Sequence, residues 1–221
     1  MPFTKPSTKR NRIFLKCLRL LLLWLVLSFN SRAQSSKMVI ENYNYLGQPG
    51  SGVVVPMIHF ETKKNWYAEL RYNYEDNQTI SFFGGKTFKG GKDFEYSLTP
   101  LAGFSAGRFT GLSLGINTEM DWKHFYISSQ TQHSFGTKKD INDFFFSWSE
   151  LGYNISENFF AGLAMQYTLQ RDYNSFEPGF VAGLTVKNFT FPVYVFSPFR
   201  TGCYFVVGIN YEHHLAKNKK R

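Results

Sequence analysis

Alternation of apolar and polar residues with a period of two constrains this chain more than any other feature. In the segment 66–75, Trp, Ala, Leu, Tyr and Tyr occupy one phase, and Tyr, Glu, Arg, Asn and Glu occupy the other. Successive side chains of a β-strand point to opposite faces, so the segment predicts a strand with one apolar and one charged face. The segments 112–122 and 159–170 repeat the pattern, with small or polar residues in the second phase.

Turn-forming residues separate these alternating segments along most of the chain. The pattern predicts an all-β fold, an antiparallel up-and-down barrel of about twelve strands. Because the first strand is the weakest of the twelve, ten strands remain the alternative. The predicted strands cover residues 37–46, 53–62, 66–75, 78–88, 94–105, 110–121, 125–135, 144–155, 159–170, 177–187, 189–197 and 202–213.

The alternation fits two kinds of barrel. A soluble β-sandwich or lipocalin-like barrel turns its apolar face inward, whereas a transmembrane barrel turns it toward lipid. Segments of about ten residues are long enough to cross a bilayer as tilted strands. Aromatic residues make up 19% of the chain, and transmembrane barrels place such residues in girdles at both interfaces. The sequence therefore favours a transmembrane barrel.

The first 33 residues have the three regions of a secretory signal peptide. Seven of the 25 basic residues and no acidic residue lie in this segment. Its apolar run, 20–29, is about half as long as the roughly 20 residues of a spanning helix. Ser31-Arg32-Ala33 resembles a signal-peptidase site, which predicts cleavage after Ala33 and export from the cytoplasm. The alternative is an uncleaved N-terminal anchor.

The segment 34–221 is predicted to be a single barrel domain with a short polar tail at 214–221. Most of the formal net charge of +9 belongs to the leader, so no basic face for nucleic acid is implied. Cleavage would leave Cys203 as the single cysteine, which excludes an internal disulfide or a zinc cluster of cysteines. No cofactor or metal site is predicted: His213 and His214 are adjacent, and adjacent strand residues face opposite sides.

Connection lengths predict the orientation of the barrel, because bacterial barrels have short periplasmic turns and longer external loops. With the mature N-terminus in the periplasm, short turns such as Lys63–Asn65 and Lys123–His124 are periplasmic. The longer connections Gly47–Gly52, Gly136–Asp143 and Arg171–Phe176 are then external. The sequence accordingly predicts residence in the outer membrane of a Gram-negative bacterium, in contact with its lipid.

The last predicted strand partly matches the C-terminal assembly signal of outer-membrane barrels. That signal has a glycine, an aromatic residue three positions later, and a second aromatic residue two positions beyond. Gly208 and Tyr211 fit, whereas His213 replaces the final aromatic residue. The partial match favours the barrel-assembly machinery as a partner during biogenesis.

Several stretches resemble an uncharacterised family of small outer-membrane barrel proteins of Gram-negative bacteria. The resemblance extends over most of the segment that follows the leader. It implies a barrel and supplies no established activity or catalytic residue. The stretches are Arg71-Tyr72-Asn73-Tyr74-Glu75-Asp76, Gly85-Lys86-Thr87-Phe88, Gly107-Arg108-Phe109-Thr110-Gly111 and Phe145-Phe146-Ser147-Trp148-Ser149-Glu150.

Charged residues in the polar phases are predicted to line the lumen, because a charge facing lipid near the bilayer midplane costs about 2–4 kcal/mol for Arg or Lys. Two interpretations follow. Paired charges would brace the wall, whereas unpaired charges would line a weakly cation-selective pore for small solutes or ions. The predicted lumen-lining residues are Glu69, Arg71, Lys86, Glu95, Glu119, Asp121, Glu150 and Lys187. The predicted function is a narrow passive pore or a structural envelope protein.

The alternative function is a lipid-modifying hydrolase. His133 has the lipid-facing phase in the segment 125–135, and Thr131 and Ser129 share that phase. A histidine can activate a hydroxyl as a nucleophile. However, no acidic partner or hydrolase motif accompanies these residues, so His133 is only a weak catalytic candidate. The other interpretation is a histidine in the aromatic girdle beside Phe135.

Overall fold

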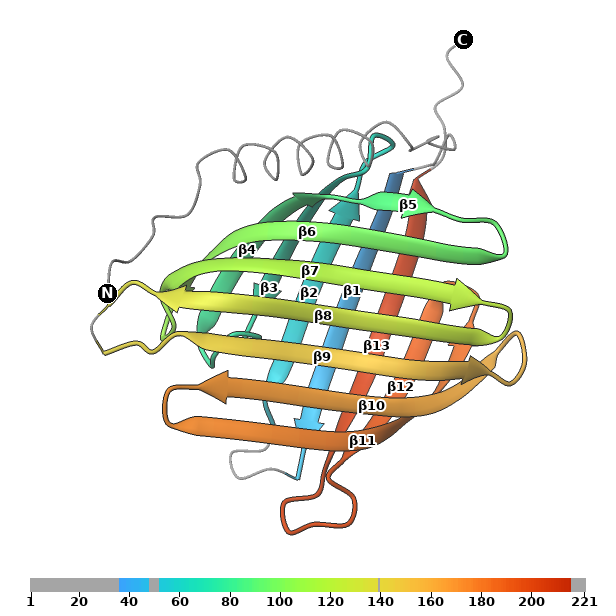
Figure 1. The fold of residues 1–221 in the computed structure, drawn as a ribbon. Coiled ribbons are helices and arrows are strands. Elements are labelled where there is room, and N and C mark those ends of the chain that lie inside the picture. Colours follow the sequence, from blue (N-terminus) through green and yellow to red (C-terminus); the bar gives the residue numbers. More distant parts are fainter. Residues whose placement is uncertain (1–35, 48–51, 139, 216–221) are drawn as a thin grey trace, which may run out of the picture. The chain divides into compact units, whose positions relative to one another are not determined.

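The computed structural model describes residues 36–47, 52–138 and 140–215, drawn in colour in Figure 1. The predicted leader and its cleavage site lie outside these described residues, as does the end of the predicted tail. Within the described part, no helix has the length and apolar character needed to cross a membrane.

The described residues form one closed antiparallel sheet. Strands that are adjacent in sequence pair with each other, except β4 with β5, and β1 pairs with β13 from Ser36–Leu215 to Leu46–Phe205. β4 and β5 both pair with β6, one after the other, and so occupy a single position in the wall. The strands are β1 (Ser36–Leu46), β2 (Val54–Glu61), β3 (Trp66–Tyr72), β4 (Thr79–Lys86), β5 (Phe88–Gly90), β6 (Phe94–Gly107), β7 (Gly111–Trp122), β8 (Phe125–Gly136), β9 (Phe144–Asn154), β10 (Phe159–Gln170), β11 (Tyr173–Val186), β12 (Phe189–Phe196) and β13 (Tyr204–Leu215).

The all-β class and the twelve wall positions confirm the prediction from alternation. Apart from the three-residue β5, each described strand pairs with strands on both of its sides, which is the condition for a sheet to lie in lipid. Most strand ends differ from the predicted ones by one or two residues, and three of the differences change a strand end or a connection noticeably. β3 ends at Tyr72, β11 begins at Tyr173, and β13 continues to Leu215, inside the predicted tail. The predicted long loop at 171–176 is therefore a short turn at 171–172.

The two rims of the barrel differ in their connections. Ser36 and Leu215 lie side by side at one rim, called here the terminal rim. Its turns include the pairs 123–124 and 187–188, where Lys123 and Lys187 have φ of 55° and 56°. The opposite rim, called the distal rim, carries the longer connections 47–53, 73–78, 137–143 and 197–203. This division of short and long connections matches the pattern predicted for a periplasmic N-terminus.

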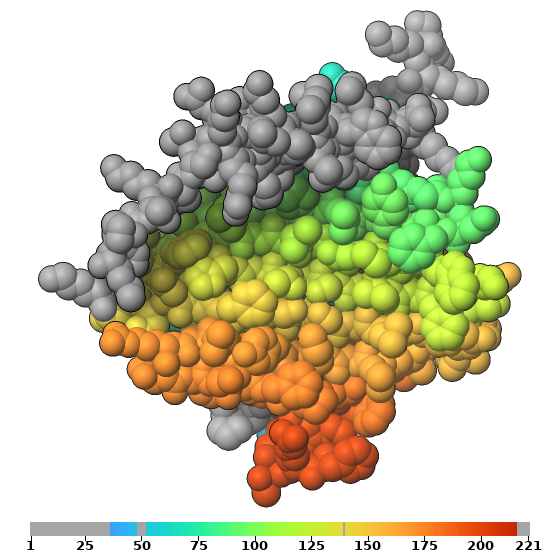
Figure 2. All heavy atoms as spheres, viewed as in Figure 1, coloured from blue at the N-terminus to red at the C-terminus, as the bar shows by residue number. Residues whose placement is uncertain are grey.

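The outer face of the barrel is apolar. Leu112, Leu114 and Leu163 are each more than half exposed there. Exposed aromatic residues gather toward the strand ends: Trp66, Trp122 and Phe159 at the terminal rim, and Phe135 and Phe176 near the distal rim. Figure 2 shows the outer surface of β6 to β11 as closely packed side chains. Two bands of aromatic residues on an apolar surface are typical of a barrel that spans a membrane.

Large side chains fill much of the interior. A buried cluster on β9 to β13 contains Trp148, Tyr194, Phe196 and Tyr204, with Tyr43 of β1 packed against it. The rings contact one another at centroid distances such as 5.0 Å for Trp148 and Tyr194. Space for such rings comes from inward-facing glycines. A Cβ added at Gly152 would lie 2.0 Å from the Tyr126 ring.

Candidate pore lumen

Two cavities lie along the interior of the barrel. The terminal cavity has a volume of about 390 Å³ and is lined by residues near the terminal strand ends, among them Lys37, Asp121 and Asn154. The distal cavity has a volume of about 260 Å³ and reaches residues of distal connections, including Val53 and Asp76.

An arginine side chain lies between the two carboxylates that it pairs with inside the barrel. The Nε of Arg71 is 2.6 Å from Oε1 of Glu69, and its Nη1 is 3.4 Å from Oε1 of Glu75. The side chain of Arg71 is 1% exposed, and both carboxylates are fully buried. The guanidinium also stacks against the rings of Tyr74 and Phe83, at 4.4 and 4.3 Å. Arginine has no neutral form at accessible pH, so burial requires these partners.

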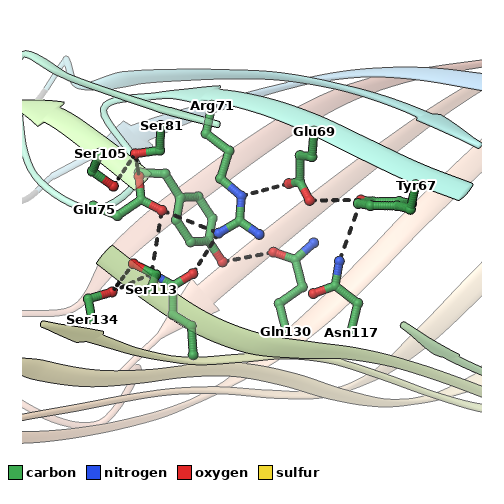
Figure 3. A network of polar contacts seen from close by, with 12 residues as sticks. Tyr67, Glu69, Arg71, Glu75, Ser81, Ser105, Ser113, Asn117, Gln130 and Ser134 are labelled. Atoms are coloured by element: carbon green, nitrogen blue, oxygen red, sulfur yellow. Dashed lines mark hydrogen bonds and ion pairs between the residues drawn. The ribbon is translucent and has the colours of Figure 1, made fainter. Parts of the chain in front are cut away.

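Hydrogen bonds extend this network to strands across the lumen. The Nη1 of Arg71 donates to Gln132 of β8 at 2.7 Å. The hydroxyl of Tyr67 donates to Glu69 at 2.7 Å, and Asn117 of β7 donates to Tyr67 at 3.5 Å. Figure 3 shows Arg71 between Glu69 and Glu75, with side chains of neighbouring strands around them. The network therefore ties β3 to β7 and β8 through the interior as well as along the wall.

Four serine hydroxyls complete the distal part of the network. The Ser81 hydroxyl of β4 is hydrogen-bonded to the Glu75 carboxylate and to the Ser105 hydroxyl of β6, the latter at 2.8 Å. Ser113 and Ser134 are bonded at 2.8 Å between β7 and β8. All four serines are buried or face the interior, and small hydroxyls allow the walls to approach closely here. We name this set, with Tyr67, Glu69, Arg71, Tyr74, Glu75, Gln130 and Gln132, the Arg71 network.

The connection between β3 and β4 bends into the lumen. Asn73 has a φ of 59°, a left-handed conformation that Asn adopts more readily than most residues and that ends the strand alternation. Tyr74 and Glu75 consequently both contact interior residues. The Tyr74 hydroxyl donates to Gln130 at 2.8 Å, and its ring meets Phe146 at 5.5 Å. The strand pattern alone had placed Tyr74 on the apolar outer phase, and the turn at Asn73 reverses that placement.

Three residues line both cavities: Tyr45 of β1, Val55 of β2 and Tyr74 of the β3–β4 connection. They lie where the terminal and distal cavities meet. Tyr45 stacks on Tyr204 at 6.1 Å, which joins it to the aromatic cluster, while Tyr74 belongs to the Arg71 network. The place where the two cavities meet is therefore bounded by the aromatic cluster on one side and by the Arg71 network on the other, and we name it the constriction.

The terminal cavity has more acidic than basic residues. Its described lining includes Lys37 and Lys89 on one hand, and Glu41, Glu61, Glu119, Asp121 and Glu150 on the other. Both lysines are neutralised by carboxylates. The Nζ of Lys37 is 2.7 Å from Glu212, and that of Lys89 is 2.8 Å from Glu61. Among the described residues, Glu119 and Asp121 have no ion pair, so the cavity presents uncompensated negative charge.

Glu150 is held by neutral donors. Its carboxylate accepts hydrogen bonds from Tyr194 at 2.8 Å, from the indole nitrogen of Trp148 at 3.1 Å and from Tyr126 at 3.5 Å. These donors balance its hydrogen-bonding needs without cancelling its charge. The carboxylate therefore adds to the negative field of the cavity while remaining fixed in position.

The structure brings five of the predicted lumen residues to the interior. Glu69 and Arg71 lie in the Arg71 network, and Glu119, Asp121 and Glu150 line the terminal cavity, where Glu119 and Asp121 are exposed. Glu95 lies opposite Asp121 in the β6–β7 register, close to the terminal rim, and is exposed. Alternation could predict that these residues face inward, because each is an even number of positions from the other polar residues of its strand.

Two predicted lumen residues need correction. Lys86 lies on the outer face: it pairs with exposed Trp66 in the β3–β4 register, and its Nζ is 5.3 Å from the Trp66 ring centre. At the terminal rim its flexible stem lets the amine reach the polar interface. Lys187 occupies the exposed turn between β11 and β12, so it belongs to no strand face.

His133 lies on the outer face with an exposed side chain, 4.5 Å from the ring of Phe135. The neighbouring hydroxyls are bonded elsewhere. Ser129 bonds Ser149 at 2.8 Å, and Thr131 bonds Ser147 at 2.9 Å. No hydrogen bond joins His133 to either hydroxyl among the described residues, so the geometry lacks the nucleophile–base contact of a hydrolase.

Sequence reasoning missed several interior residues. Glu41, Tyr43 and Tyr45 share one phase of β1, and that phase was visible in the sequence as Lys, Val, Glu, Tyr, Tyr at alternate positions. Glu61 is the last residue of β2, and Lys89 lies in the three-residue β5, outside the predicted strands. Among the described residues, no group of three His, Cys, Asp or Glu side chains is arranged to hold a metal ion.

A closed antiparallel barrel with an apolar exterior, aromatic bands and a polar, partly filled interior is the architecture of small outer-membrane pores. Comparison with solved structures agrees on the fold. A KdgM porin in complex with disordered oligogalacturonate superposes with a TM-score of 0.55 at 12% identity, covering 80% of this chain and 99% of that one. A NanC porin superposes with a TM-score of 0.52 at 9% identity, covering 81% of this chain and 100% of that one. No family model and no curated protein sequence matches the chain.

Proposed function

We propose that this protein is a narrow passive pore of the Gram-negative outer membrane, reached after cleavage of the leader at 1–33. The observation that carries the proposal is the pair of cavities that approach each other inside a closed barrel and meet at Tyr45, Val55 and Tyr74. The porin fold of the similar structures supports it. The resemblance to a family of small outer-membrane barrels is part of the same proposal.

The charges of the terminal cavity indicate which solutes would pass. Glu119, Asp121 and Glu150 face the cavity without a cationic partner among the described residues, and rings of acidic side chains favour cations. The comparison porin was solved with oligogalacturonate, a polyanion. An acidic lumen repels polyanions, so oligogalacturonate is not the solute that we propose for this chain.

Single-channel recording of the refolded full chain in a planar bilayer tests the pore. We expect small, ohmic conductance steps with a weak preference for K⁺ over Cl⁻. A silent protein that nevertheless shifts its gel mobility on boiling, as folded barrels do, would support the structural envelope function instead. Phospholipid turnover on the same sample, lost in His133→Ala, would favour the hydrolase.

The orientation is tested by cysteine labelling of intact cells. In a Cys203→Ser background, a membrane-impermeant maleimide should reach a cysteine at Lys138, in the exposed distal connection. The same reagent should not reach one at Lys64, in an exposed terminal turn, until the outer membrane is permeabilised. Labelling at Lys64 alone in intact cells would mean that the terminal rim faces outward.

A further inference from the structure

The described residues contain two exposed tryptophans, and a lysine lies over each of them at the terminal rim. Trp66 begins β3 and is 58% exposed, and Trp122 ends β7 and is 49% exposed. The Nζ of Lys86 is 5.3 Å from the centre of the Trp66 ring, and that of Lys123 is 4.9 Å from the centre of the Trp122 ring. Tryptophan rings are apolar with one polar N–H, and they prefer the headgroup level of a bilayer. The two pairs therefore mark that level on the outer surface of the barrel.

Two further lysines lie beside the first of these pairs. Lys63 and Lys64 occupy the turn between β2 and β3, and both are exposed, as is Lys86 at the end of β4. The main-chain N–H of Thr87 donates to the carbonyl of Asn65 at 2.9 Å, which joins the end of β4 directly to this turn. The three lysines thus belong to one hydrogen-bonded corner of the rim. We name Lys63, Lys64 and Lys86 the lysine patch.

No carboxylate among the described residues neutralises the lysine patch. None of its three members forms an ion pair there. Glu61 ends β2 next to the turn, but its carboxylate lines the terminal cavity and is 2.8 Å from the Nζ of Lys89. The patch therefore presents three positive charges at the rim, and the protein supplies no anion for them within its described part.

The surroundings of the other exposed tryptophan differ in charge. Asp121 and Lys123 flank Trp122 in sequence, and Glu95 lies opposite Asp121 in the β6–β7 register. All three charged side chains are exposed. One cation and two anions thus lie near Trp122, whereas three cations lie near the tryptophan of β3. The protein consequently contains its own reference, a similarly exposed tryptophan at the same rim without a basic patch.

The lipid-facing position of Lys86 determines where its counter-ion must come from. Lys86 pairs with Trp66 in the β3–β4 register and shares its outer face. A lysine on that face extends its aliphatic stem along the wall and holds its ammonium group at the headgroup level. Lipid phosphates are the anions at that level, and clustered lysines at a membrane surface attract anionic lipids. The wall beside it is apolar, since Leu70 and Phe82 pair in the same register and are 41% and 43% exposed.

We propose that the lysine patch binds the headgroup of an anionic phospholipid of the phosphatidylglycerol class, whose acyl chains lie against the outer face of β3 and β4. The phosphodiester of such a lipid supplies the negative charge that the described residues do not. A zwitterionic lipid such as phosphatidylcholine carries its own ammonium group, which the three lysines repel. The binding rests on the proposed function only in that the barrel must lie in a membrane, and it does not depend on conduction.

Quenching of Trp66 fluorescence by brominated lipids tests the binding. The full chain carries Trp24→Phe and Trp122→Phe, so that Trp66 reports together with Trp148, which is buried inside the barrel. It is refolded into phosphatidylcholine vesicles that contain the same fraction of dibromo-phosphatidylglycerol or of dibromo-phosphatidylcholine with identical chains. We expect phosphatidylglycerol to be about threefold enriched beside Trp66, because clustered lysines attract anionic lipid. Equal quenching by the two lipids would overturn the proposal.

Charge variants locate the site. The joint substitution Lys63→Gln, Lys64→Gln and Lys86→Gln should abolish the preference for phosphatidylglycerol. Lys86→Arg should keep it, because the positive charge remains. Lys138→Gln, in the exposed distal connection, is the matched control and should also keep it. Loss of the preference in Lys138→Gln would show that the overall charge of the protein, and not the patch, attracts the lipid.

Moving the reporter tests whether the preference belongs to this corner of the rim. With Trp66→Phe in place of Trp122→Phe, Trp122 reports on its own surroundings, where Asp121 and Glu95 offset Lys123. The preference should be absent there. An equal preference at both tryptophans would overturn a local site. Excess inorganic phosphate at constant ionic strength should not reduce the preference at Trp66, and displacement of the lipid would assign the patch to free phosphate instead.

The outcomes separate this site from the proposed pore. Quenching by both brominated lipids without preference, in a protein that conducts, would remove the lipid site and keep the pore. The expected preference in a protein without conductance would remove the pore and keep the site. A preference that persists in the triple lysine variant, with boiling-dependent gel mobility intact, would overturn the assignment to the lysine patch. Quenching by neither lipid would mean that β3 does not face a membrane, and both proposals would fail.

Discussion

Arg71→Ala should destabilise the barrel by about 3–5 kcal/mol and raise its conductance at the same time. Removing one partner of a buried ion pair leaves the other charge without compensation, and this is the origin of the large cost. Here two buried carboxylates, Glu69 and Glu75, would lose their cation, and Gln132 would lose its donor. The space vacated by the guanidinium lies beside Tyr74 and loosens the constriction. Unfolding in urea with detergent, and single-channel recording, measure the two effects.

An exposed arginine supplies the matched control. Arg108 pairs with Asp76 at 3.3 Å, but the Arg108 side chain is 67% exposed. Exposed pairs contribute about 0–1 kcal/mol, so Arg108→Ala should have little effect on unfolding and a much smaller effect on conductance than Arg71→Ala. The double variant Arg71→Met with Glu69→Gln should recover part of the stability lost in Arg71→Ala, because it removes the opposing charge as well. Equal stability of Arg71→Ala and Arg108→Ala would contradict the buried network.

The fold was largely predictable because alternation reports local geometry. A transmembrane strand must present apolar side chains to lipid at every second position, so the pattern persists over whole strands such as β7 and β10. Pairing with the next strand in sequence then fixes the order of the sheet. Two-residue turns, such as those at 123–124 and 187–188, can join only strands that are adjacent and antiparallel.

The interior was less predictable, for reasons that particular residues show. Segment 78–88 has Phe82 and Phe83 in opposite phases, and its single charge, Lys86, stands at the end of β4. Thr79, Ser81 and Phe83 share the buried phase of β4. Packing of Phe83 inside the barrel, and not the charge of Lys86, therefore determines which face of β4 points inward. Alternation reads one strand at a time, and what packs across the lumen depends on strands that are distant in sequence.

The contact between Arg71 and Gln132 illustrates the same limit. A buried arginine requires a carboxylate nearby, and the structure supplies two: Glu69 from the same strand and Glu75 from the following connection. The residue that reaches across from β8 is neutral Gln132, 61 positions away in the chain. Only closure of the barrel brings these residues together, so no local pattern could identify the partner.

Tyr74→Ala should raise the single-channel conductance several-fold, because Tyr74 is one of the three residues that bound the constriction between the two cavities. The narrowest section of a pore dominates its resistance, and loss of the ring would join volumes of about 390 and 260 Å³. Tyr74→Phe keeps the ring and removes only the hydrogen bond to Gln130, so its conductance should stay near that of the native protein.

Tyr72→Ala provides the matched control, since Tyr72 is a tyrosine two positions away whose side chain is 43% exposed on the outer face. Its conductance should not change. Loss of the Tyr74 ring also removes a stacking partner of Arg71, so some loss of stability is expected in Tyr74→Ala and boiling-dependent gel mobility must be checked. If Tyr74→Ala folds and conducts no more than Tyr72→Ala, the solute route does not run between the two cavities, and the β3–β4 connection is a brace within a closed lumen.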